Sequence, residues 1–252
     1  LNYVWNEVVL NLREKVVLYG LDMFFDAAVG GGRRELYSTR EDLSGLKDNT
    51  LINTCRKLEL ISDIVYTKLN HILTMRNDIG ASHPNSYSIN AFELLGWLQT
   101  CVQDILNDKP SASAIQIKSF IENLKKSSEI LDEATIQSME RPLNELSLQN
   151  TDNLLNSLFG IYTAETTGNI VRKNIALFVP HIWNKSSENV KYKLGVTLDG
   201  YKINLHNEKH AFGLELFTFC DGNRYQSLDS RIISLDSHAD DLLEARYAWT
   251  NF

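Results

Sequence analysis

Apolar residues recur at steps of three and four along most of the chain, the spacing that gathers them on one face of an α-helix. The clearest pattern predicts a helix over residues 50–76, with an apolar stripe of Leu51, Cys55, Leu58, Ile61, Val65, Leu69 and Ile72. A second long helix is predicted over residues 3–29, ended by Gly30-Gly31-Gly32. A third is predicted over residues 88–106, with Ser88 or Asn90 as N-cap and a core stripe of Phe92, Leu95, Leu98, Val102 and Ile105.

The same periodicity predicts further helices at about 113–131, 134–148, 151–163 and 168–181, one through residues 212–219, and a final one at about 236–249. Residues 193–205 are ambiguous, because Asp199-Gly200 between two apolar runs is typical of a hairpin while the apolar steps of three and four favour a helix. We choose the helix and predict an all-α protein. The polar, turn-rich stretch 107–113 predicts two domains, residues 1–108 and 109–252.

Composition agrees with an ordinary globular protein, since 43% of residues are hydrophobic and 23% are charged. No apolar run approaches the roughly 20 residues that span a membrane. The N-terminal segment carries Glu7, Arg13 and Glu14, which argues against a signal peptide. We therefore expect a cytoplasmic protein with no membrane partner.

The cysteines and the net charge exclude several classes of function. Cys55, Cys101 and Cys220 are scattered without C-x2-C spacing, so neither a disulfide framework nor a zinc site is expected. The net charge of −7 speaks against broad electrostatic binding to nucleic acid. Binding of RNA would need a local basic cleft. The candidates to line it are Arg33, Arg34 and Arg40, for which a solvated loop is the alternative.

The stretch Arg76-Asn77-Asp78-Ile79-Gly80-Ala81-Ser82-His83 carries the candidate chemistry. A histidine can exchange a proton with a ribose hydroxyl or a leaving oxygen, and an arginine can hold the charge of a pentavalent phosphate. Gly80 and Pro84 predict a turn that brings His83 back towards Arg76. Because no zinc, Walker, dinucleotide or serine-triad motif is present, we expect no metal and no cofactor.

An arginine and a histidine at this spacing also occur by chance. Arg231 and His238 have the same separation. The first pair differs from the second by its polar neighbours and by the helix break between its members. The alternative for Arg76 is a cation that stabilises the end of its helix, with His83 a surface residue.

These residues resemble the R-x4-6-H motif of the HEPN superfamily, in which Asn, Asp or His commonly follows the arginine. Arg76, Asn77 and His83 match that motif, and the longer spacing is similar to variants in abortive-infection and phage-defence proteins. The resemblance covers roughly residues 1–110. It implies an N-terminal helical bundle followed by further packed helices, and a homodimer whose two motifs line one cleft.

For the function, the resemblance implies a metal-independent endoribonuclease, a toxin or antiviral effector that cleaves RNA. His83 would be the general acid or base, Arg76 would hold the phosphate, and Asn77 and Asp78 would orient them. Some similar toxins carry a tyrosine after the histidine that a partner protein modifies, which gives Tyr87 a regulatory role. An antitoxin or defence-system protein would then be a partner.

A second hypothesis is a non-catalytic helical module that binds a nucleotide, a nucleic acid or a protein. Some HEPN domains are of this kind. Arg76 and His83 would then be capping or ligand-contacting residues. The two hypotheses differ in geometry, because catalysis requires both side chains to converge on one cleft.

Overall fold

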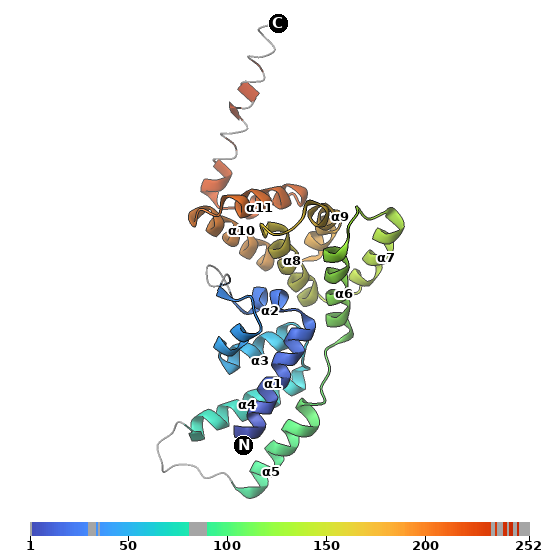
Figure 1. Cartoon of the computed structure of the whole chain (residues 1–252). Helices are drawn as coiled ribbons and strands as arrows, with labels where there is room; N and C mark the ends of the chain where they lie inside the picture. The colour runs from blue at the N-terminus through green and yellow to red at the C-terminus, as the bar shows by residue number, and fades with distance from the viewer. Residues whose placement is uncertain are drawn as a thin grey trace. The chain divides into compact units, whose positions relative to one another are not determined.

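The computed structural model is built of α-helices joined by short connections (Figure 1). It describes residues 2–29, 34, 36–80, 90–232, 235, 239, 240, 242, 243 and 246, with side chains as far as Asn77 in the second of the longer ranges. No strand occurs in this described part of the chain. The all-α prediction is therefore confirmed.

The chain folds into two compact units. Unit 1 comprises Leu1–Asn123 and Glu145–Asn153, and unit 2 comprises Leu124–Asn144 and Leu154–Phe252. Two helices, α6 (Ala112–Lys126) and α8 (Leu148–Thr163), contain points at which the chain passes from one unit to the other. The expected domains 1–108 and 109–252 stay a prediction.

Unit 1 begins with two helices where the sequence predicted one. Helix α1 is Asn2–Tyr19 and helix α2 is Leu21–Ala28, and Gly20 between them has φ 132°, a conformation that L side chains rarely adopt. The prediction of a continuous helix over 3–29 is wrong at this residue. Its apolar pattern is nevertheless confirmed on both sides of the break, since Leu12 and Phe24 are both fully buried.

The predicted helix 50–76 is also two helices, α3 (Asp48–Lys57) and α4 (Asp63–Gly80). The chain leaves α3 through Glu59, at φ 54°. The Leu60 amide donates to the Cys55 carbonyl at 2.8 Å and the Glu59 amide to the Arg56 carbonyl at 2.9 Å, the paired bonds of a Schellman motif. Ser62 Oγ then accepts from the Val65 amide at the start of α4. All seven residues of the predicted stripe are buried all the same.

Helix α5 (Ala91–Thr100) has Asn90 as its N-cap, as predicted, and its side chain accepts from the Glu93 amide. The predicted core stripe is wrong for Phe92, Leu95 and Val102, which are exposed. The core side is instead that of Trp97, Cys101 and Ile105, and the Trp97 ring packs edge-on against His71 of α4. The sequence has two apolar faces here, and the bulkier Trp97 lies on the buried one. A π-helical turn, Cys101–Ile105, continues α5.

Unit 2 is built around α9 (Asn169–Lys185), α10 (Glu188–Ile203) and α11 (Asn207–Phe219), with α7 (Glu133–Leu143) against α9. The aromatic rings of Phe159, Trp183 and Phe217 meet edge-on in its core. The choice of a helix over a hairpin near residue 200 is confirmed, as is the helix through 212–219. Of the predicted helix 236–249, residues 239, 240, 242, 243 and 246 are described and helical, and the others lie outside the described residues.

The ends of two predicted helices in this half are wrong. Helix α6 ends at Lys126 where the pattern predicted residue 131, and α7 ends at Leu143 where it predicted 148. In the first case the side chain of Asn174 takes the place of a helical partner for the following backbone, as it accepts from the Leu131 amide and donates to the Glu129 carbonyl. In the described part of the chain no helix is long and apolar enough to cross a membrane.

Candidate functional site

Arg76 lies near the end of α4 and turns towards the starts of α1 and α3. Its Nη1 donates to Asp48 Oδ2 at 3.2 Å, and its Nε lies 3.4 Å from Asn2 Oδ1. Both members of the ion pair keep about a third of their side chain exposed, Arg76 30% and Asp48 29%. The guanidinium is thus held by tertiary contacts and not by the carbonyls of its own helix.

Trp5 completes this arrangement. Its Nε1 donates to the same oxygen of Asp48 at 2.8 Å, and its ring lies under the Arg76 guanidinium at 5.5 Å. Trp5 itself is 1% exposed, so the indole is a fixed wall of unit 1. The aromatic face and the carboxylate together fix the position and the charge balance of Arg76.

The other members of the predicted motif are placed only in part. Asn77 follows Arg76 on α4 and is exposed. Asp78 lies in the same helix, which continues to Gly80, but its side chain is outside the described residues. His83 and Tyr87 lie outside the described residues altogether. The convergence of Arg76 and His83 therefore stays a prediction.

The described arginines of the predicted RNA-binding group are already paired with carboxylates. Arg34 Nε donates to Asp26 Oδ1 at 2.6 Å, and its Nη1 donates to the Tyr37 carbonyl at 2.5 Å. Arg40 pairs with Glu14 of α1. Arg33 lies outside the described residues. An RNA phosphate would have to compete with these carboxylates for Arg34 and Arg40.

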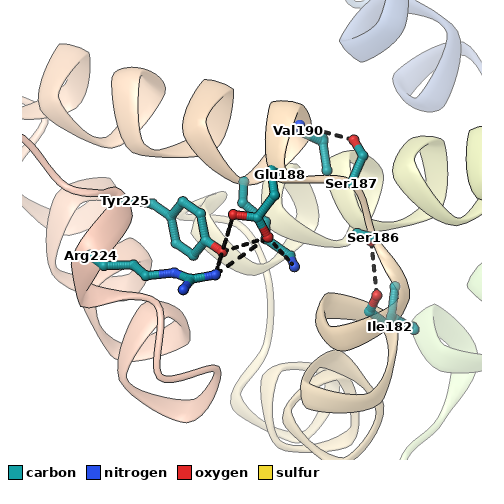
Figure 2. Close-up of polar contacts among 8 residues, drawn as sticks. Ile182, Ser186, Ser187, Glu188, Val190, Arg224 and Tyr225 are labelled. Carbon is teal, nitrogen blue, oxygen red and sulfur yellow. Dashed lines mark hydrogen bonds and ion pairs between the residues drawn. The ribbon is translucent and has the colours of Figure 1, made fainter.

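A polar cluster in unit 2 was not found by sequence reasoning. Glu188, in the first turn of α10, accepts from Tyr225 Oη at 2.9 Å, from Lys191 Nζ at 3.2 Å and from Arg224 Nη2 at 3.2 Å (Figure 2). The hydrogen bond from Tyr225, followed by that from Lys191, lowers the pKa of the Glu188 carboxyl below its usual value. The partners are 3, 36 and 37 positions from Glu188, so no local spacing signals the cluster.

This cluster fastens the turn Asn223–Tyr225 (η4) onto α10. Lys191 keeps only 8% of its side chain exposed, and its Nζ lies 5.9 Å from the ring centres of Trp183 and Tyr225. Next to it, Gly195 allows a close approach, because a Cβ there would lie 1.9 Å from the Tyr225 carbonyl oxygen. Each charged group has an opposite or aromatic partner within the cluster, an arrangement suited to holding a turn in place.

A buried lysine in unit 1 has a structural partner as well. Burial lowers the pKa of Lys15, and its Nζ lies 3.4 Å from the Ile105 carbonyl at the end of the π-helical turn. Burial raises the pKa of the nearby Cys55 thiol to about 12. All three cysteines are free and buried, as the sequence predicted for Cys55 and Cys101. In the described residues no group of three or more His, Cys, Asp and Glu side chains could hold a metal ion.

The helices and their packing define an all-α protein with two compact units. Comparisons of the chain with models of known protein families, with curated proteins and with solved structures found no match.

Proposed function

We propose that the chain is a metal-independent endoribonuclease of the HEPN type, acting as a toxin or antiviral effector. The observation that carries this proposal is the motif Arg76-Asn77 followed by His83, at the end of a helix and before a glycine and a proline. In this proposal His83 moves the proton of the ribose hydroxyl or of the leaving oxygen, and Arg76 holds the phosphate.

The surroundings of Arg76 support a role in positioning charge. A guanidinium that binds a transition state works best when it is held before the substrate arrives. Asp48 and the Trp5 ring hold Arg76 in this way while leaving 30% of its side chain exposed. Asn77 is exposed beside it and would orient the substrate. Two chains would place their motifs in one cleft, and an antitoxin or another defence protein would restrain the activity.

A second candidate function is a non-catalytic helical module that binds a protein, a nucleotide or a nucleic acid. The observation in its favour is that Arg34, Arg40 and Arg76 each pair with a carboxylate. Together with the net charge of −7, these pairs leave few cations for RNA in the described part of unit 1.

Cleavage of a mixed RNA pool in EDTA tests the two against each other. We expect the parent chain to cut RNA, His83→Ala to lose cleavage, and His71→Ala and His238→Ala to keep it. His71 is the matched control, because it is an exposed histidine of α4 outside the motif. Arg76→Lys is preferred to Arg76→Ala, since it keeps a cation beside Asp48 while removing the planar fork that binds phosphate.

Each variant is also unfolded with urea, so that a loss of cleavage is counted only at unchanged stability. Cleavage by His83→Ala at the parent rate would refute the catalytic role of His83. If the parent cuts no RNA with or without a magnesium supplement, the nuclease proposal fails and the binding module takes its place.

A further inference from the structure

Beyond α11 the chain carries an exposed apolar stripe with heptad spacing. The described residues after Ser227 are helical and, apart from the half-buried Ser230, exposed. Four large aliphatic side chains among them have much of their surface in solvent: Leu228 66%, Ile232 47%, Leu235 70% and Leu242 73%. They follow one another at steps of four, three and seven, which places them along a single line on an α-helix.

The start of this segment is anchored to the rest of unit 2. Ser227 Oγ lies 3.3 Å from the Ser230 amide, and the Arg231 amide donates to the Ser227 carbonyl at 3.0 Å, as in a capped first helical turn. The Ser227 and Ser230 hydroxyls both donate to Asp199 Oδ1 of α10, at 3.0 and 2.8 Å. The stripe therefore begins at a fixed point.

The stripe matches the pattern of a two-stranded coiled coil. With Leu228 at position d of a heptad, Leu235 and Leu242 also fall at d, and Ile232 and Ala239 fall at a. Leucine at d with a β-branched residue at a favours a parallel pair of helices. From 228 to 246 the segment has 19 positions, roughly 28 Å of helix at 1.5 Å per residue.

We infer that this segment, 228–246, is the surface through which two copies of the chain associate, as a parallel coiled coil. Its charges suit a second copy of itself. Arg231 falls at position g, and five positions on the sequence places Asp236 at e, the pairing that joins two parallel helices. An antiparallel pair would instead set e against e, where Asp229 and Asp236 both lie. Positions a and d between 228 and 242 carry no charge, so two chains of net charge −7 meet there on neutral side chains.

The inference rests on no RNA chemistry, and the mass of the particle in solution tests it without any substrate. Sedimentation equilibrium of the full chain is expected to give the mass of two chains. Leu235→Glu, which puts a carboxylate at a central d position, is expected to give the mass of one chain. Leu95→Glu is the matched control, because Leu95 is also an exposed helical leucine, 61% against 70%, on the outer face of α5. It is expected to leave the dimer intact.

Disulfide cross-linking reads the direction of the helices. The native cysteines are all buried, so an added surface cysteine is the reactive one. With copper phenanthroline as the oxidant, Leu242→Cys is expected to give covalent dimers, since two d positions face each other in a parallel pair. Asp240→Cys lies at b, on the outer side, and is expected to stay uncross-linked.

A single-chain mass for the parent would overturn the inference, as would a dimer that Leu95→Glu dissociates and Leu235→Glu does not. Dimers without a Leu242→Cys cross-link would overturn the parallel arrangement. None of these results depends on whether RNA is cleaved, so the failure of this inference and that of the proposed nuclease are distinguished.

Discussion

Gly195 of α10 should be the most sensitive glycine in unit 2, because the Tyr225 backbone passes directly over it. A Cβ at this position would lie 1.9 Å from the Tyr225 carbonyl oxygen and 2.9 Å from its carbonyl carbon. Ordinary contact begins at 3.4 Å, so Gly195→Ala requires the turn Asn223–Tyr225 to move by about 1.5 Å, the difference between 3.4 and 1.9 Å. That movement would also stretch the 2.9 Å bonds from Tyr225 Oη to Glu188.

Gly200 of the same helix is the matched control, since a Cβ there meets nothing within 4 Å. Alanine is favoured over glycine inside a helix by roughly 0.5–1 kcal/mol, so Gly200→Ala is expected to stabilise the protein by about that much. The same helical gain applies to Gly195→Ala and cancels when the two variants are compared. The remaining difference is the clash, about 3 kcal/mol because backbone and not a flexible side chain is in the way.

Urea unfolding followed by tryptophan fluorescence measures this difference. Trp183 packs edge-on against the Tyr225 ring with 5.4 Å between ring centres, so its emission reports on the turn itself. Equal free energies of unfolding for Gly195→Ala and Gly200→Ala would refute the close approach of the turn to α10.

Three further results are expected. Arg76→Ala should lower the free energy of unfolding by about 1 kcal/mol, the sum of a half-exposed ion pair with Asp48 and a cation–π contact, as measured in urea. A loss in the double variant with Asp48→Ala equal to the sum of the single losses would show that the pair does not interact. Asn174→Asp should cost about 2 kcal/mol by the same measurement, because a buried amide that donates to a backbone carbonyl becomes an acceptor; an unchanged midpoint would contradict the buried bond. Glu188 has a lowered folded pKa, so its contribution to stability is present above its unfolded value near 4.5 and lost as pH falls through the folded value. The stability of Glu188→Gln should accordingly depend less on pH in that window, and parallel curves for variant and parent would exclude the coupling.

The sequence predicted the burial of residues better than the ends of helices. The stripe from Leu51 to Ile72 is buried throughout, although its helix is interrupted in the middle. The interruption was missed because the left-handed residue at the end of α3 is Glu59, where glycine would have given a signal. The face of α5 was mistaken because Phe92 and Leu95 offered the more regular pattern while Trp97 occupies the core.

The candidate site was predictable only as a local motif. Arg76 and Asn77 lie at the end of a helix near the predicted place. The partner of Arg76 is Asp48, 28 positions earlier, and the ring beneath it is Trp5, so its environment is a product of packing between α1, α3 and α4. The cluster around Glu188 likewise depends on a residue 37 positions away. Spacing within one helix carries no information about contacts of this kind.

The points at which the chain passes between the two units have a consequence for synthesis. Unit 1 takes its last segment from Glu145–Asn153, after the chain has already contributed Leu124–Asn144 to unit 2. A nascent chain therefore cannot complete unit 1 until residue 153 has left the ribosome, and the N-terminal helices must wait for a segment made long after them. Fragments designed to isolate one unit would have to join two separate stretches of sequence with a linker, because no single cut yields either unit whole.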